Sequence, residues 1–206
     1  MDNRILEMQT EFSKSRYEIL PSKFWMEFNT QHLEQLRQFG YENFKRTLAL
    51  NYFTFVSGFR DPQISHLFSR LPIRSVIKVI TRTLFSGKHD YLPLKGSINY
   101  NLLTHLAWEF VSEQDDERLL DKLTEPQEGN PPRISVDNKL ISQDLANSVL
   151  EYKSIMHPSI DHSSIEVVVE LGSGYGRTAY VIMSLLPHVK YIVVDIPQHY
   201  MCLNDI

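Results

Sequence analysis

The sequence is poor in cysteine and in long apolar runs. Its single cysteine, Cys202, excludes an internal disulfide framework and a zinc cluster built on cysteines, which favours the reducing cytoplasm as the setting. No apolar run reaches the ~18 residues that span a bilayer, so no membrane span is expected. The first residues, MDNRILEMQTEF, carry Asp2 and Glu7 and lack the apolar segment of a secretory signal.

The chain also lacks an excess of basic residues. Its 21 Lys and Arg are outnumbered by 25 Asp and Glu, which gives a formal net charge of −4. A general nucleic-acid binder needs a basic surface to neutralise phosphates, so nucleic acid is not an expected partner. Hydrophobic residues make up 42% and charged residues 22% of the chain, which predicts a packed core rather than a disordered chain.

The common hydrolase, phosphate-binding and metal motifs are missing. The sequence contains no H-E-x-x-H motif, no Gly-x-Ser-x-Gly elbow and no Walker loop. Its eight histidines are scattered, and His157 and His162 are separated by a proline-containing linker that suits metal ligands poorly. We therefore assign no metal site and no role to any histidine.

Residues 1–160 are predicted to form a mainly α-helical N-terminal or lid region. Capping and proline signals predict helix starts at Pro21-Ser22, Asp61-Pro62, Gly96-Ser97 and Ser142. Apolar residues recur at helical spacing in each segment, which predicts one buried face per helix. The residues expected on these faces are Phe24, Phe28 and Leu36; Ile73, Val76, Ile77, Ile80 and Leu84; Ile98, Leu102, Leu106 and Phe110; and Leu145, Val149, Tyr152 and Met156.

The helix over 73–84 has a second, basic face made by Arg74, Lys78 and Arg82. Such a stripe could meet an anionic partner, but a solvated helix face is the favoured interpretation in an acidic protein. The segment therefore predicts a helix with its apolar side inward and its basic side in solvent.

A proline-rich break precedes a predicted hairpin. Residues 125–132, EPQEGNPP, hold three prolines, which remove backbone donors and restrict the residues before them. Short β-branched runs on both sides of Asp137-Asn138 predict a small hairpin near 133–141. The next helix is predicted to end at His157-Pro158, before a linker that reaches residue 164.

Residues 165–206 carry the strongest signal. Val167–Leu171 and Tyr191–Val194 are nearly continuous apolar runs, typical of parallel strands buried on both faces. A glycine-rich turn over 172–177 leads from the first run into a helix, and Asp195 follows the second run. The helix between them is predicted to bury Ala179, Ile182, Met183 and Leu186.

This order of elements is the nucleotide-binding half of a doubly wound sheet. The predicted fold is therefore α/β, with a mainly helical N-terminal region followed by the first β-α-β unit of an incomplete Rossmann-like sheet. Glycines let a ligand lie against the backbone, and a helix N-terminus offers N–H groups to an anion. A carboxylate at the second strand tip, Asp195, has two acceptor oxygens that match the vicinal hydroxyls of a ribose.

The glycine spacing distinguishes between two adenosine cofactors. The dinucleotide fingerprint G-x-G-x-x-G would need its third glycine at position 177, where this chain has Arg177. The pattern present is E-x-G-x-G-x-G, which begins at Glu170 and resembles motif I of class I S-adenosylmethionine-dependent methyltransferases. A glycine-rich turn without a ligand is the alternative, and the two strands with the terminal acid favour cofactor binding.

The resemblance narrows to the bacterial putative sugar O-methyltransferase family, from about residue 95 to the end. The segments that carry it are Gly129–Pro132, Leu140–Ser148, Glu170–Thr178 and Val194–Pro197. The resemblance implies that S-adenosylmethionine is contacted by Glu170, Gly172, Gly174, Gly176 and Asp195, with Ser173 and Arg177 as weaker candidates. Gln143 and Asp144 are candidates to close over the cofactor, although a helix cap is the favoured role.

The resemblance implies an O-methyltransferase acting on a hydroxyl of a sugar or glycan precursor, and no catalytic residue is assigned. Because the family's sheet continues beyond two strands, we expect a truncated chain, in which residues 165–206 form a partial cofactor-binding domain. A second copy or a complementing C-terminal half is the expected protein partner, and activity of this chain alone is left open. Two alternatives remain: a non-catalytic remnant whose residues 1–160 fold as a helical interaction module, and an NAD-binding protein, which Arg177 disfavours.

Overall fold

The computed structural model describes residues 7, 10, 11, 14, 22–47, 62–85, 97–157 and 159–195. Over these residues the protein is a mixed α/β structure. Its strands are short and form two small sheets, β1 with β2 and β3 with β4. In chain order the elements are α2 (Lys23–Phe39), η1 (Tyr41–Asn43), α3 (Phe44–Thr47), α4 (Pro62–Arg70), α5 (Ile73–Phe85), α6 (Ser97–Ser112), α7 (Leu119–Lys122), β1 (Ile134–Val136), β2 (Lys139–Ile141), α8 (Gln143–Ile155), η2 (His162–Ser164), β3 (Val167–Leu171), α9 (Arg177–Leu185) and β4 (Lys190–Val194).

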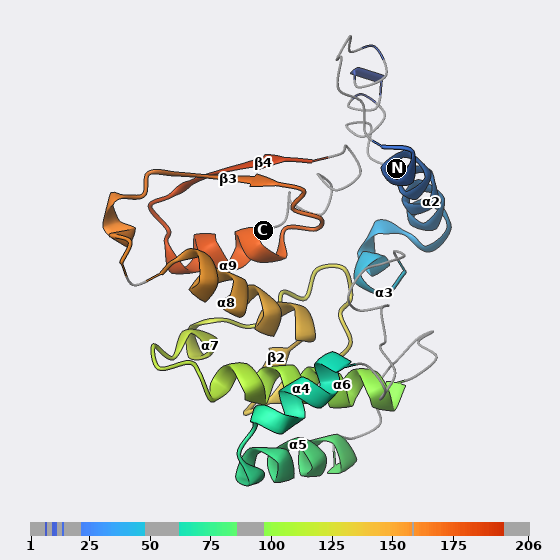
Figure 1. Cartoon of the computed structure of the whole chain (residues 1–206). Helices are drawn as coiled ribbons and strands as arrows, with labels where there is room; N and C mark the ends of the chain where they lie inside the picture. Colours follow the sequence, from blue (N-terminus) through green and yellow to red (C-terminus); the bar gives the residue numbers. More distant parts are fainter. Residues whose placement is uncertain are drawn as a thin grey trace.

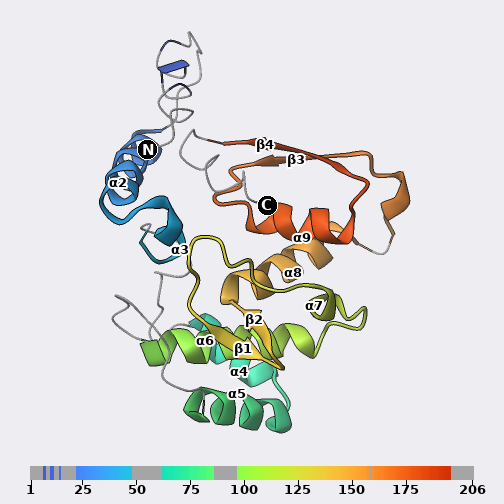
Figure 2. The same ribbon diagram turned by 180° about the vertical axis from the view of Figure 1, so that it is seen from behind.

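The elements form a stack. The β3–β4 pair lies at one end with α9 beneath it, followed by α8, then α6 with the hairpin, and α5 at the other end (Figure 1). The view from behind shows the same order, with α2 and α3 to one side of the stack (Figure 2). Helix α6 and helix α9 both pack against α8, so α8 joins the two halves of the molecule.

The predicted helix start at Ser22 is confirmed. Ser22 precedes α2 in an extended conformation, and its hydroxyl accepts a hydrogen bond from the backbone N–H of Trp25 at 3.5 Å. The predicted buried face is only partly correct, because Leu36 is buried while Phe28 is half-buried and Phe24 is exposed. The α2 face that carries Phe24 and Trp25 therefore has no cover from the described residues.

Helix α5 does not bury the apolar stripe predicted for it, and its buried residues are Ser75 and Val79. Four of the five residues of its apolar stripe are exposed, and the fifth, Val76, is half-buried. The basic face instead contacts α6, where Glu109 accepts hydrogen bonds from Lys78 and Arg82, both at 2.8 Å. The prediction was wrong because anionic partners for the basic stripe lie in the same chain and rotate the helix toward these ion pairs, although the Arg74 and Lys78 side chains stay 75% and 52% exposed.

Helix α6 is buried around most of its circumference. Leu106, one of the residues predicted to face inward, is fully buried, while Leu102 and Phe110 are half-buried. The helix also buries polar residues, among them Asn101, Thr104 and His105. A helix with apolar residues on several sides fits a central position, and α6 contacts α4, α5 and α8. The side chain of Ile98 lies outside the described residues.

The hairpin and α8 agree with the prediction. Strands β1 and β2 pair antiparallel around Asp137 and Asn138, which both have positive φ, as a two-residue turn of type I′ requires. The hydroxyl of Ser142 accepts from the N–H of Leu145 at 2.9 Å and caps α8. The whole predicted face of α8 is buried, namely Leu145, Val149, Tyr152 and Met156.

Strands β3 and β4 pair in parallel, in register from Val167 opposite Lys190 to Leu171 opposite Val194. Within the described part of the chain they form a two-stranded sheet, and only one of its faces is covered, by α9 (Figure 1). The prediction that the strands are buried on both faces was wrong. The side chains exposed on the open face are Val167, Val169, Leu171, Ile192 and Val194.

The largest hydrophobic cluster extends across the predicted domain boundary near residue 160. It includes Trp108 of α6 and Val149 of α8 together with Val181 and Ile182 of α9, all of them buried. Of the α9 residues predicted to face inward, Ala179, Ile182 and Leu186 are buried and Met183 is exposed. The division into two domains near residue 160 remains a prediction. Among the described residues, one hydrophobic cluster includes side chains from both sides of that boundary.

The described residues show neither a membrane-spanning helix nor a metal-binding cluster. None of their helices has the length and apolar character needed to cross a bilayer. Within the same ranges, no group of three or more His, Cys, Asp or Glu side chains is arranged to hold a metal ion.

Candidate functional site

The glycine-rich turn joins β3 to α9 through three left-handed backbone positions. Gly172, Gly174 and Gly176 have φ values of 77°, 60° and 84°. A Cβ at position 172 or 174 would meet no atom of the described residues within 4 Å, so the loop needs glycine for its backbone conformation and leaves space beside it among those residues. Gly176 is the residue before α9, and the N–H of Tyr180 donates to its carbonyl at 2.8 Å.

Asp195 lies at the carboxyl end of β4, beside this turn. Its Oδ2 accepts a hydrogen bond from the backbone N–H of Gly174 at 2.8 Å and another from the hydroxyl of Ser173 at 3.3 Å. Because parallel strands end at the same edge of a sheet, the acid and the turn meet although 20 residues separate Gly174 from Asp195 in the chain. The structure thus brings together the two features that the sequence singled out.

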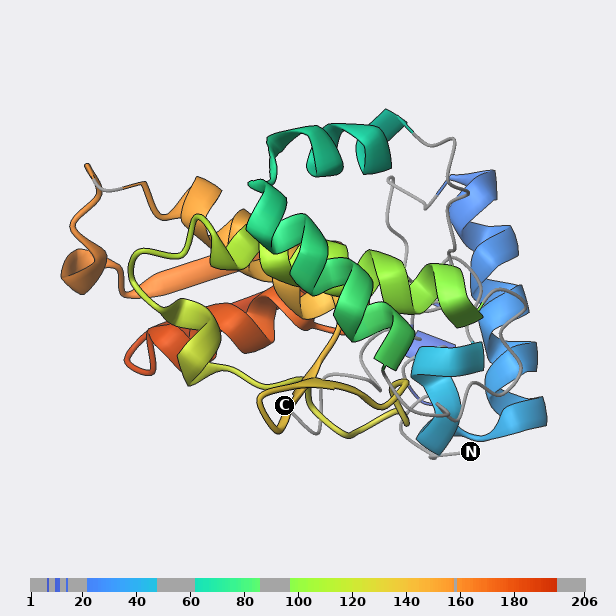
Figure 3. The same cartoon turned by 90° about the horizontal axis from the view of Figure 1, so that it is seen from below.

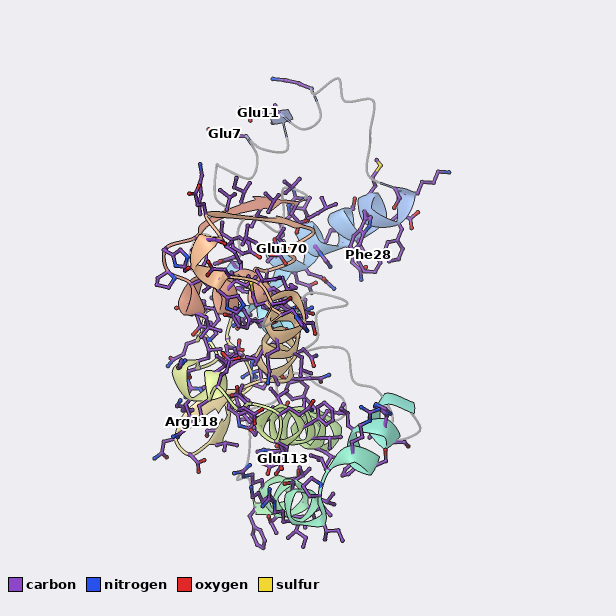
Figure 4. All side chains as sticks on the ribbon, turned by 60° about the vertical axis from the view of Figure 1, so that its left-hand side comes forward. Glu7, Glu11, Phe28, Glu113, Arg118 and Glu170 are labelled. Carbon is purple, nitrogen blue, oxygen red and sulfur yellow. The ribbon has the colours of Figure 1, made fainter. Side chains whose placement is uncertain are left out.

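Glu170 belongs to β3 and faces the covered side of the sheet. One of its oxygens accepts from the hydroxyl of Tyr191 on β4 at 2.9 Å. Burial raises the pKa of Glu170, and the hydrogen bond from Tyr191 opposes that rise. Burial and the nearby Glu170 also raise the pKa of Tyr191, so its hydroxyl stays protonated and donates. Figure 4 shows Glu170 in the half of the stack that contains the sheet.

Arg177 is engaged with α8. Its Nη2 donates to Oε1 of Glu151 at 2.8 Å, and the hydroxyl of Thr178 donates to Oε2 of the same carboxylate at 2.6 Å. Glu151 thereby holds the first turn of α9 against α8. The role of Arg177 as a cofactor contact remains a prediction, and its contact with Glu151 joins α9 to α8.

A buried ion pair lies behind the turn. Lys45 of α3 and Glu125 form a salt bridge with side chains only 3% and 4% exposed. Lys45 also donates to the carbonyl of Pro126 at 2.8 Å, and its Nζ lies 5.7 Å from the ring centroid of Tyr175 in the turn. The remaining oxygen of Glu125 accepts from the hydroxyl of Ser142, the capping residue of α8.

This ion pair connects three distant segments: α3, the proline-rich break and the glycine-rich turn. Tyr175 and Arg177 of the turn, together with Phe44 and Lys45 of α3, line a recess beside the turn. Sequence reasoning missed Lys45, Glu125 and Glu151. Single charged residues in ordinary helical or loop contexts carry no local signal of burial, so only the tertiary contacts identify them.

Gln143 and Asp144 occupy the first turn of α8, as predicted. Asp144 is 2% exposed, and neither of its carboxyl oxygens has a hydrogen-bond partner among the described residues. Burial raises the pKa of Asp144 well above its ordinary value of 3.8, and the charge of Arg177 opposes that rise. The capping function belongs to Ser142 rather than to either of these two residues.

No family model, curated protein or solved structure matches this chain. The resemblance to sugar O-methyltransferases therefore rests on the sequence motifs alone. The structure places Glu170, Gly172, Ser173, Gly174 and Asp195 around one end of the β3–β4 pair, with Gly176 and Arg177 at the start of α9. Gln143 and Asp144 lie on a neighbouring element, at the start of α8.

Proposed function

We propose that the chain binds S-adenosylmethionine at the glycine-rich turn and belongs to an O-methyltransferase that acts on a sugar or glycan precursor. In this proposal β3, α9 and β4 are the first unit of a Rossmann-like sheet. The observation that carries the proposal is the hydrogen bond between the Gly174 N–H and the Asp195 carboxylate. It supports a single site in which the turn and the acid act on one ligand.

The turn fits a cofactor that lies close to the backbone. Side chains at positions 172 and 174 would project into open space, which glycine leaves available to a ligand. Asp195 fits a ribose, because a carboxylate has two acceptor oxygens, which match the two vicinal hydroxyls of that sugar. These two features support an adenosine-containing ligand in general.

The choice of S-adenosylmethionine over a dinucleotide rests on position 177. The dinucleotide fingerprint has a third glycine near the helix start, where it allows close packing of helix and strand, and Arg177 stands there with its side chain paired to Glu151. S-adenosylmethionine has no pyrophosphate and supplies an electrophilic methyl group on a sulfonium. Its transfer to a hydroxyl oxygen releases the hydroxyl proton and leaves a thioether, so alignment of the acceptor oxygen with the methyl group dominates the chemistry.

Isothermal titration calorimetry of the full chain with S-adenosylmethionine, S-adenosylhomocysteine and NAD tests the site. We expect the two adenosyl sulfur compounds to bind and Asp195→Asn to weaken their binding about tenfold, the equivalent of one hydrogen bond. The amide keeps an acceptor for the Gly174 N–H, so the turn should retain its shape. Asp116→Asn, at an exposed acid elsewhere, is the matched control and should leave affinity unchanged.

Preferential binding of NAD would overturn the cofactor assignment, and absence of any binding would favour the non-catalytic interaction module. The acceptor class needs a separate assay. Transfer of a labelled methyl group to members of a panel of sugars and glycan precursors would support it. Transfer to hydroxyl compounds other than sugars would refute the sugar assignment and leave the cofactor assignment standing.

A further inference from the structure

A polar pocket lies between the proline-rich break and the hairpin. Its volume is about 330 Å³, at the lower end of the range for small-molecule sites, roughly 300–1,000 Å³. Seen from below, the yellow-to-gold segments that form it lie side by side at one edge of the molecule (Figure 3). The polar side chains that line the pocket are Gln127, Asn130, Arg133, Ser135 and Asn138.

Three of these side chains have hydrogen-bonding groups available to a ligand. Gln127, Ser135 and Asn138 are exposed, and their side chains make no hydrogen bond within the described part of the chain. They reach the pocket from the break, from β1 and from the hairpin turn. Because an amide or a hydroxyl both donates and accepts hydrogen bonds, the three side chains offer donors and acceptors to one bound molecule.

The walls of the pocket are held in place by the rest of the fold. Arg46 of α3 donates through Nε to the carbonyl of Asn130 at 2.5 Å and through Nη2 to the carbonyl of Pro131 at 3.2 Å. On the other side, the N–H of Glu125 donates to the carbonyl of Leu140 at 2.9 Å and ties the break to the hairpin. A ligand therefore meets a backbone that needs little further ordering, which lowers the entropic cost of binding.

The break separates this pocket from the glycine-rich turn. Pro126 and Glu128 line the recess beside the turn, whereas Gln127, the residue between them, lines the polar pocket. The pocket is therefore a second candidate site, distinct from the one assigned to the cofactor. An inference about it goes beyond the proposed function and does not require S-adenosylmethionine.

We propose that this pocket binds a neutral sugar residue. Each sugar hydroxyl both donates and accepts, as do the side chains of Gln127, Ser135 and Asn138. Pro131 and Leu140 complete the lining and supply apolar contacts for the C–H groups of a sugar ring. The mixture of two-way hydrogen-bonding groups with a small apolar surface thus matches the chemistry of a carbohydrate.

Other small ligands fit the same lining less well. A phosphate only accepts hydrogen bonds and is best met by several cations, but the described lining contains a single one, Arg133. A nucleobase gains most of its binding energy by stacking on aromatic rings, and the described lining contains none. The amides and the hydroxyl therefore favour a sugar over an anion or a base.

Titration of the isotope-labelled full chain with glucose, galactose, mannose and N-acetylglucosamine, without S-adenosylmethionine, tests the proposal by NMR. We expect at least one sugar to shift the side-chain amide signals of Gln127 and Asn138, which are assigned by their loss in Gln127→Ala and Asn138→Gly. Each substitution should weaken the binding about three- to tenfold, the equivalent of one hydrogen bond. Glycine at position 138 accepts the φ of 63° that the type I′ turn requires, so the hairpin should stay folded. Gln38→Ala, at an exposed amide of α2, is the matched control and should leave the affinity unchanged.

Absence of shifts with all four sugars would overturn the proposal. Binding that Gln127→Ala, Ser135→Ala and Asn138→Gly all leave unchanged would overturn it too, because the sugar would then lie elsewhere. Inorganic phosphate that shifts the same amide signals more strongly than any sugar would assign the pocket to an anion instead. Since none of these measurements uses the cofactor, each of these failures would leave the proposed function standing.

Discussion

Arg177 at the start of α9 donates to Glu151 of α8 at 2.8 Å, and this ion pair joins the helices on either side of the predicted domain boundary. The apolar contacts follow the same path, since the largest cluster includes residues of α6, α8 and α9. The glycine-rich turn is therefore supported by the helical part of the chain. A site at the turn depends on that support for its geometry.

Limited proteolysis should reveal this dependence. We expect cleavage in the loop over 157–164 to give two fragments that remain associated, because the α8–α9 contact is buried and apolar. Size-exclusion chromatography of the nicked protein should show a single peak that contains both pieces. A stable core ending near residue 159, eluting without its C-terminal piece, would contradict the prediction and support the helical module.

Alanine at Gly174 should separate a ligand role from a folding role. The φ of 60° makes any side chain there cost roughly 1–2 kcal/mol of folding free energy. The new Cβ meets no atom, so urea unfolding should show no further loss, while affinity for S-adenosylhomocysteine should fall by tenfold or more, about 1.4 kcal/mol.

Gly129→Ala is the comparison for this variant. Gly129 also has positive φ, and its added Cβ would overlap the buried ring of Phe44. We expect a larger loss of stability for Gly129→Ala, by about 1–3 kcal/mol, from the forced repacking. Gly129→Ala should lower the affinity for S-adenosylhomocysteine less than Gly174→Ala does. The reverse order of affinities would argue against a ligand at the turn.

Removing the charge of Lys45 should be among the most damaging single changes. Lys45→Met leaves Glu125 buried without its cation, which typically costs about 3–5 kcal/mol. Urea unfolding measures the loss, and Lys45→Met combined with Glu125→Gln should recover part of it. Arg118→Met is the control, because Arg118 pairs with Asp121 at an exposed position where ion pairs contribute about 1 kcal/mol or less (Figure 4).

Asp144 should make the protein less stable as the pH rises. Its pKa is raised in the folded state, so the folded chain binds this proton more tightly than the unfolded chain. The stability that the neutral form contributes is complete below the ordinary pKa of 3.8 and is lost as pH rises through the raised value. Glu170, whose pKa is also raised, contributes in the same direction.

The comparison of Asp144→Asn with wild type isolates the first of these groups. Unfolding free energies measured across this pH range should decline less steeply in the variant, because its amide does not titrate. Asp116→Asn, at an exposed acid, should follow the wild-type curve. Identical slopes for Asp144→Asn and wild type would show that Asp144 titrates normally in the folded protein.

Local features were predictable because they depend on neighbouring residues. The cap at Ser142, the type I′ turn at Asp137-Asn138 and the glycine-rich turn each follow from the conformations that those side chains permit. The proximity of Gly174 and Asp195 was predictable too, since the order of strand, helix and strand places both at the same edge of a parallel pair.

The choice of which helix face is buried was not local. Apolar periodicity predicted that α5 turns Ile77 and Ile80 inward, yet the basic residues of the helix pair with Glu109 of α6 and with Glu113, which follows α6. The burial of Lys45 and Glu125 likewise depends on where α3 meets the proline-rich break, 80 positions later in the chain.

The sequence by itself determined the starts of α2 and α8, the hairpin turn and the pairing of a glycine turn with a strand-end acid, because these follow from backbone sterics and short-range hydrogen bonds. The tertiary structure alone decided which faces are covered and which charges are buried. Burial is a property of the whole packed chain, and the same amphipathic helix can lie either way until the charge and shape of its neighbours are known.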